Sequence, residues 1–213
     1  MPATLLLAPA AQGKTEQAVR RIAAARVGSP LSTIVVLLPS RNQVQAFRAR
    51  LAAQGQALGV RLFTFYDLYA DLLAQTGGLL PRLDGAVQTD LLRRLTDRLA
   101  GQGRLAYYTP LLDKPGFPAT LRDTLEVLKR ARLAPEMLAA AVAQAGLGPR
   151  LDALSAVYAA YQDWLLAHNW ADPEGLGWLS ALALEHNPTL AGDWRSLVVD
   201  GFDEFNPTQL AVL

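Results

Sequence analysis

The chain has 213 residues, a length that favours a single large α/β or helical domain carrying an insertion. Apolar residues make up 51% and charged residues 18%, a composition that excludes a disordered chain. The sequence contains no cysteine, which excludes disulfides, thiolate metal sites and a cysteine nucleophile. The net charge of +1, taken over the whole chain, gives no sign of a polyanion-binding protein.

The charge is distributed unevenly along the chain. Residues 1–61 contain eight basic residues and one acid, a local balance of +7, and the other 152 residues carry 12 basic and 18 acidic residues. A positive N-terminal part favours binding of phosphates near the N-terminus. The alternative is a solvated helix face that uses arginine as a good helix former.

No segment approaches the ~18 to 20 consecutive apolar residues that a membrane-spanning helix needs. The first ten residues lack the basic start of a signal peptide, and Pro9 interrupts their apolar run. We therefore expect a soluble protein of the cytoplasm with no membrane contact.

The first 75 residues alternate short β-type runs with helical patterns. The run at residues 33–38 (TIVVLL) is β-branched and continuously apolar, as in a strand buried on both faces of a parallel sheet. The same criteria predict strands at residues 4–7 and 60–64 and helices at residues 15–26, 42–53 and 67–75, the second of which begins after Ser40. This order is typical of a parallel sheet with βαβ crossovers.

Residues 84–187 show only amphipathic helical patterns separated by glycine and proline, and residues 196–199 return to a buried strand. A segment of this length between two strands indicates a subdomain rather than a loop. We expect an α/β, P-loop NTPase-like parallel sheet with a large all-helical insertion. The core takes residues 1–80 and 190–213, and the insertion takes residues 81–189.

A candidate phosphate-binding loop, APAAQGKT, occupies residues 8–15 between a predicted strand and a predicted helix. In a Walker A loop the backbone N–H groups face the phosphates, the lysine reaches the β- and γ-phosphates, and the threonine hydroxyl ligates Mg²⁺. The expected nucleotide contacts therefore come from Ala11, Gln12, Gly13, Lys14 and Thr15. The alternative is an ordinary strand-to-helix turn, which leaves Lys14 unexplained.

A second candidate motif, LVVDGFDEF, occupies residues 197–205. An aspartate at the carboxyl end of a buried strand is typical of a Walker B motif, so Asp200 is expected to hold Mg²⁺ opposite Thr15. The alternative is a simple Asp-Gly turn.

With both motifs, the chain resembles the ATP-binding core of superfamily 1 helicases of the UvrD/RecB type, and the N-terminal part of AddB-like helicase/nuclease subunits in particular. Residues 35–41 (VVLLPSR) and 62–68 (LFTFYDL) are similar to motif Ia and to the segment that follows it. The resemblance implies a helicase 1A/1B-like fold, with ATP and Mg²⁺ as cofactors. It also implies DNA, as a single strand or a duplex end, and a partner subunit as partners of the parent protein, with Ser40, Arg41 and Thr64 contacting DNA.

The chain departs from this family's pattern at several positions. Gly201 stands where active helicases have the glutamate that orients the attacking water, so weak or absent hydrolysis is expected. Asp203 and Glu204 are possible substitutes, and no catalytic residue is assigned. Ala8 and Ala11 replace expected glycines and should stiffen the loop.

Other conspicuous side chains are expected to be structural. His168 and His186 have no acidic or histidine partner at ligand spacing, and Arg93, Arg94 and Arg98 lie near acids on a predicted solvated face. One apolar stripe has helical spacing and is predicted to pack in a core: Leu154, Tyr158, Tyr161, Trp164 and Leu165.

The sequence therefore predicts a nucleotide-binding, helicase-like module with weak ATPase activity at best. It would come from the front part of a longer helicase–nuclease subunit that processes double-strand DNA breaks. The alternatives are a non-catalytic scaffold that binds a partner and DNA ends, and an unrelated P-loop kinase.

Overall fold

The computed structural model describes residues 4–7, 9, 11–27, 32–55 and 58–213. The chain divides into two compact units. The sheet unit takes the described residues of 1–72 together with residues 183–205, and the helical unit takes residues 73–182 and 206–213.

A three-stranded parallel sheet forms the centre of the sheet unit. Its strands are β1 (Thr33–Leu37), β2 (Val60–Phe63) and β3 (Trp194–Val199), in the order β2-β1-β3. The central strand β1 has the sequence TIVVL, and all of its residues after Thr33 are buried. The strands predicted at residues 33–38, 60–64 and 196–199 are confirmed, and so is the parallel α/β arrangement.

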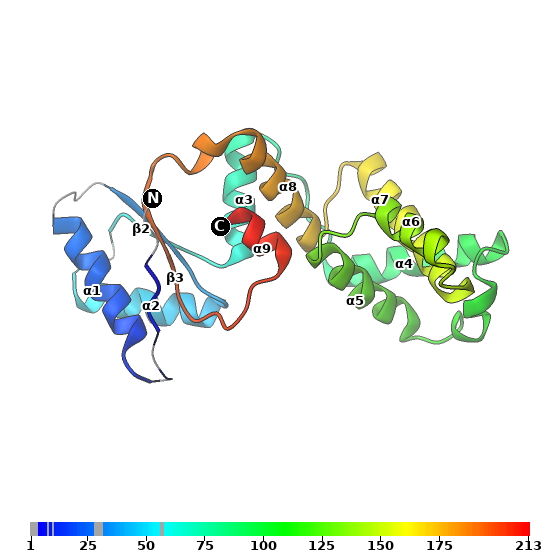
Figure 1. Ribbon diagram of the computed structural model, residues 1–213, viewed down its shortest axis with the longest axis horizontal. Coiled ribbons are helices and arrows are strands. Elements are labelled where there is room, and N and C mark those ends of the chain that lie inside the picture. Colours follow the sequence, from blue (N-terminus) through cyan, green and yellow to red (C-terminus); the bar gives the residue numbers. More distant parts are fainter. Residues whose placement is uncertain (1–3, 8, 10, 28–31, 56–57) are drawn as a thin grey trace. The chain divides into compact units, whose positions relative to one another are not determined.

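Helices α1 (Lys14–Val27) and α2 (Arg41–Ala53) pack on one face of this sheet, and α3 (Phe65–Thr76) begins on the other side (Figure 1). Val19, Ile22 and Phe47 bury their side chains in one core with Ile34 and Val36 of β1. These helices follow the amphipathic patterns at residues 15–26, 42–53 and 67–75, which confirms those predictions.

The predicted strand at residues 4–7 is wrong. These residues adopt no strand conformation, and Leu5 and Leu7 are 80% and 83% exposed. The central strand β1 already has a neighbour on each side, so a further strand could join only at an edge of the sheet. An apolar segment does not form a strand unless a neighbouring strand pairs with it. This segment also contains three leucines and no Val or Ile, the residues with the stronger strand preference.

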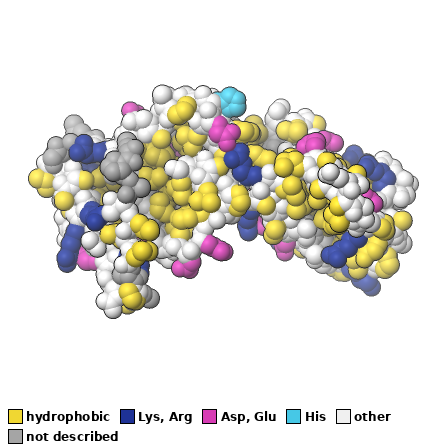
Figure 2. Space-filling view, in the orientation of Figure 1, with side chains coloured by type: hydrophobic (Ala, Val, Ile, Leu, Met, Phe, Trp, Pro, Cys, Tyr) yellow, Lys and Arg dark blue, Asp and Glu magenta, His cyan; other side chains and the backbone are white. Residues whose placement is uncertain are grey.

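The helical unit contains the long helical segment of the chain. Its elements are α4 (Gly85–Gly101), the 3₁₀ helix η1 (Ala106–Leu111), α5 (Phe117–Arg130), α6 (Pro135–Ala145), α7 (Pro149–His168), α8 (Pro173–His186) and α9 (Pro207–Val212). The last residues of α3 also belong to this unit, and the last residues of α8 belong to the sheet unit. Another 3₁₀ helix, η2 (Pro188–Ala191), precedes β3. Residues 84–187 form no strand, as predicted, and one isolated bridge joins Arg82 to Ala171. Figure 2 shows hydrophobic side chains on the visible surface of α6 and α7.

The predicted packing stripe on α7 is confirmed. Leu154, Tyr158, Tyr161 and Leu165 are buried in the core of the helical unit, and Trp164 packs against it. His168 and His186 are exposed, as expected for surface residues. The solvated basic face is also confirmed, because Arg93 and Arg94 both pair with Asp90 at exposed positions of α4.

Within the described residues, no helix is long and apolar enough to span a membrane.

Candidate nucleotide site

The three parallel strands finish side by side, so their carboxyl ends form one end of the sheet, which we call the carboxyl edge. Leu37 is in register with Phe63 on one side and with Val199 on the other. Beyond these residues, the Asp200 N–H donates to the carbonyl oxygen of Leu37 at 3.1 Å. Ligands of open parallel sheets bind outside this edge, so the residues that follow each strand are the first candidates for a site.

Two candidate metal ligands, 185 residues apart in the sequence, meet at this edge. The Thr15 hydroxyl on the first turn of α1 donates to Asp200 Oδ2 at 2.8 Å, in a partly buried position. A hydrogen bond to a carboxylate is stronger than one between neutral groups. The structure therefore brings together the threonine of the candidate phosphate loop and the aspartate that follows β3.

The described part of the loop has a backbone suited to close approach of a ligand. Gly13 has φ +76°, and a Cβ added there would meet no atom within 4 Å. Ala11 also has a positive φ, at +59°, a conformation that costs energy for a residue with a Cβ. Lys14 Nζ donates to the carbonyl oxygen of Pro9 at 2.8 Å, and α1 begins at Lys14. Ala8, another position of the expected loop, lies outside the described residues.

The oxygen atoms at this site suit a hard cation. Mg²⁺ prefers oxygen ligands and is usually bound by one or two protein groups together with substrate phosphates and water. Thr15 and Asp200 supply a hydroxyl and a carboxylate. Among the residues the structure describes, no group of three or more His, Asp or Glu side chains could hold a metal ion. The side chains thus fit an ion shared with a phosphate better than an ion held by the protein alone.

The three expected DNA contacts lie after β1 and β2 on the same edge, and two of them cap helices. Ser40 Oγ accepts the Gln43 N–H at 3.3 Å and begins α2. The Thr64 hydroxyl and N–H both donate to Asp67 Oδ2, at 2.7 and 3.1 Å. Arg41 has a side chain that is 85% exposed, with one guanidinium nitrogen 3.8 Å from Asp67 Oδ1. Asp67 was not predicted as a site residue, although Thr-x-x-Asp is a known helix-start pattern.

The turn after Asp200 has a backbone that suits glycine. Gly201 has φ +82°, and an added Cβ would lie 3.4 Å from Pro39 Cδ. Asp203 and Glu204, the possible substitutes for the missing base, are exposed. Phe202 and Phe205 pack against Phe65 with ring centroids 5.3 and 6.2 Å away. The two phenylalanines therefore anchor this turn to the start of α3, next to the residues that cap it.

A second polar cluster, in the helical unit, has no counterpart in the sequence analysis. Lys129 Nζ lies 2.8 and 2.7 Å from the two carboxylate oxygens of Asp172, with both side chains almost fully buried. Gln162 accepts a third hydrogen bond from Lys129 at 3.1 Å, and Asp172 accepts the Gly175 N–H at 2.6 Å. Burial, followed by the negative charge of Asp172, raises the pKa of the nearby Tyr161. Lys129 and Asp172 are 43 residues apart, and no local sequence pattern indicates such a pair.

Comparison with known proteins identifies the family. The model of the family described as "ADDB, N-terminal" matches residues 5–213, so the chain belongs to this family. It is also similar to an ATP-dependent helicase/deoxyribonuclease subunit of Symbiobacterium thermophilum, with 26% identity over 221 residues, covering 98% of this chain and 18% of the relative. The protein of the same name from Pelotomaculum thermopropionicum is 27% identical over 226 residues, covering 100% of this chain and 19% of the relative. The chain thus spans about a fifth of the length of these curated relatives.

Proposed function

We propose that this chain is a helicase-like, nucleotide-binding module of a helicase–nuclease subunit that processes DNA double-strand breaks together with a partner subunit. In this proposal the sheet unit is the P-loop NTPase-like core, and the long helical segment is an insertion in it. Family membership and the names of the two relatives support the proposal. They give no support to the alternative of an unrelated P-loop kinase.

The hydrogen bond between Thr15 and Asp200 carries the nucleotide-binding part of the proposal. If the two motifs were only an ordinary strand-to-helix turn and an ordinary Asp-Gly turn, we would not expect these two side chains to lie 2.8 Å apart. Mg²⁺ bound with ATP requires a hydroxyl and a carboxylate near each other, at the end of the sheet where phosphates bind.

Each residue of the site has a distinct task in this proposal. Thr15 and Asp200 would hold Mg²⁺, which supplies positive charge to the phosphates when it is bound. Lys14 would exchange its hydrogen bond with the Pro9 carbonyl for the β- and γ-phosphates. Ala11, Gln12 and Gly13 would present backbone N–H groups, for which the open space around Gly13 leaves room.

The same site gives little support to rapid hydrolysis. A water molecule attacking the γ-phosphate has to be oriented, and the position after Asp200 is a glycine with positive φ. Asp203 and Glu204 lie exposed further along the turn. We therefore propose that the module binds Mg-ATP and hydrolyses it slowly or not at all.

Calorimetric titration of the full chain with ATP, with and without Mg²⁺, tests this proposal. Binding should be Mg²⁺-dependent, and both Lys14→Ala and Asp200→Ala should weaken it at least tenfold. Lys114→Ala, an exposed lysine of the helical unit, is the matched control and should bind ATP as wild type does. A folded chain that binds no nucleotide, or a Lys14 variant that binds normally, would contradict the proposal.

The second candidate function is the non-catalytic scaffold. The observation that favours it is the exposed segment at residues 4–7, which does not form the strand that normally supports a phosphate loop. A scaffold predicts normal folding and DNA or partner binding by the chain, with no response to nucleotide. The titration described above therefore distinguishes it from the first candidate.

A further inference from the structure

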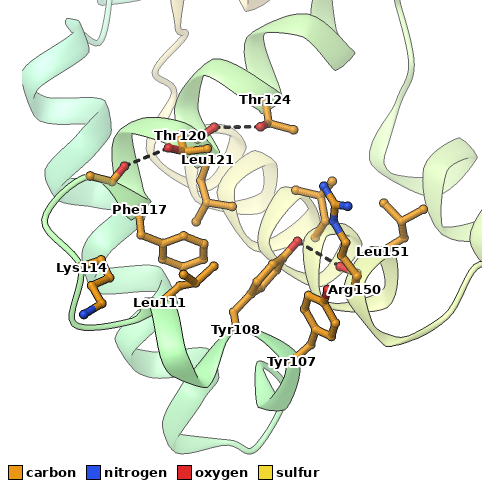
Figure 3. Close-up of a pocket in the computed structure, with 12 residues that line it drawn as sticks. Tyr107, Tyr108, Leu111, Lys114, Phe117, Thr120, Leu121, Thr124, Arg150 and Leu151 are labelled. Atoms are coloured by element: carbon orange, nitrogen blue, oxygen red, sulfur yellow. Dashed lines mark hydrogen bonds between the residues drawn. The ribbon is translucent and has the colours of Figure 1, made fainter.

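The helical unit has a cavity of about 490 Å³ where η1, the start of α5 and the start of α7 meet (Figure 3). This volume lies within the range of about 300–1,000 Å³ that is usual for sites of small organic groups. All of the lining residues belong to the helical unit and to the part of the chain that the structure describes. The cavity shares no residue with the candidate nucleotide site, which belongs to the sheet unit.

Three aromatic residues line the cavity, Tyr107, Tyr108 and Phe117. Tyr108 packs against Tyr107 and Phe117 with centroid distances of 5.4 and 5.2 Å. Tyr107 is 50% exposed, so part of it is accessible to a ligand, whereas Tyr108 and Phe117 are buried. Accessible rings of this kind bind flat, unsaturated groups by stacking.

The charged residues that line the cavity are both positive. Lys114 and Arg150 lie on opposite sides of it in Figure 3, and none of its lining residues is acidic. The neighbouring acids in the sequence, Asp113 and Asp152, are exposed and do not line the cavity. The two cations therefore suit a ligand that has an apolar ring in its centre and a negatively charged group on each side of the ring.

Three hydroxyl groups of the wall donate hydrogen bonds to the protein backbone. Tyr108 donates to the Arg150 carbonyl at 3.1 Å, Thr120 to that of Gly116 at 3.1 Å, and Thr124 to that of Thr120 at 2.8 Å. Burial raises the pKa of Tyr108, which keeps its hydroxyl protonated as a donor. The wall thus offers shape and ring faces more than specific hydrogen bonds, which suits stacking without a strong sequence preference.

We propose that this cavity binds one unpaired nucleotide of single-stranded DNA, with the base against Tyr107 and the flanking phosphates at Lys114 and Arg150. This inference rests on the proposed function in DNA processing. An acidic peptide with an aromatic side chain is the competing occupant. The paired cations on opposite sides favour a nucleotide, because a base within a strand has a phosphate on each side of it.

Binding of short oligothymidylate to the full chain, followed by fluorescence anisotropy, tests the proposal. A second oligonucleotide with one 2-aminopurine base reports directly whether a base stacks on a ring. Tyr107→Ala should weaken binding about tenfold and remove the 2-aminopurine quenching, since one stacked base contributes roughly this much. Tyr107→Phe should retain both, and Lys114→Ala should weaken binding and reduce its dependence on salt.

Two exposed residues of the helical unit outside the cavity provide matched controls. Arg98→Ala removes a positive charge from α4, Leu166→Ala truncates an exposed apolar residue of α7, and both should bind as wild type. Wild-type chain that binds no oligonucleotide, or Tyr107→Ala that binds normally, would overturn the inference. An acidic aromatic peptide that displaces the oligonucleotide at lower concentration would overturn the choice of occupant.

Nucleotide titration of the same variants separates this inference from the proposed function. Tyr107→Ala and Lys114→Ala should bind Mg-ATP normally if both proposals are correct. If Tyr107→Ala and Lys114→Ala bind the oligonucleotide as wild type does while the chain binds ATP, only the cavity proposal is refuted. Cavity effects in a chain that binds no ATP refute the nucleotide site alone.

Discussion

Replacing Lys129 with methionine should destabilise the helical unit strongly. Lys129 and Asp172 form a buried ion pair with side chains only 2% and 6% exposed. Without the lysine, Asp172 keeps the Gly175 N–H as a hydrogen-bond donor but loses its two contacts with the ammonium group. Breaking a buried pair by removing one partner typically costs about 3–5 kcal/mol, because the remaining charge stays buried without its opposite charge.

A second substitution separates the effect of the unpaired Asp172 charge from the effect of lost packing. Asp172→Asn neutralises the carboxylate and retains an oxygen that can accept the Gly175 N–H at the start of α8. The double variant Lys129→Met, Asp172→Asn should therefore be more stable than Lys129→Met alone, by about 1–3 kcal/mol. Urea denaturation with hydrogen exchange of the α5 and α7 amides measures both, because it reports on the helical unit directly. A cost below about 1 kcal/mol for Lys129→Met, or a double variant no more stable than the single one, would refute this reasoning.

The remaining predictions concern a buried tyrosine, a helix cap and two glycines. Burial raises the pKa of Tyr158, so the stability that its protonated hydroxyl contributes is complete below pH ~10 and is lost as the pH rises further. In the alkaline range, Tyr158→Phe should therefore make the unfolding free energy fall less steeply with pH, by about 1.4 kcal/mol per pH unit. Ser40→Ala should cost about 1 kcal/mol in urea denaturation, since it removes the cap of α2. Gly13→Ala should weaken Mg-ATP binding at least severalfold in calorimetry, because a side chain is strained at φ +76°. Gly201→Glu should not produce rapid phosphate release, and a large gain would contradict the strain expected at φ +82°.

The local patterns of the sheet unit predict its elements well. The TIVVL run of β1 has a strong β preference, and burial on both faces fits its uninterrupted apolar character. Residues 4–7 looked similar in hydropathy but lie outside the sheet. A strand needs a neighbour to pair with, and the identity of that neighbour is not a property of the segment itself.

The polar contacts differ in the same way. The side chains of Thr15 and Asp200 could be expected to meet because phosphate and Mg²⁺ chemistry demands both. Thr64 and Asp67 are three residues apart, so their contact follows from a local helix-start pattern. Lys129 lies on α5 and Asp172 directly precedes α8, without a shared motif, and only the folded helical unit brings them together.

The two consecutive residues after β3 separate nucleotide binding from hydrolysis in the proposed function. Asp200 keeps the carboxylate that pairs with Thr15, whereas Gly201 has a backbone conformation that disfavours the glutamate of active helicases. A glutamate at position 201 would thus strain the turn that carries the proposed metal ligand, and Phe202 and Phe205 hold this turn against Phe65. The turn is therefore compatible with the proposed nucleotide binding and disfavours a glutamate base at the position after Asp200.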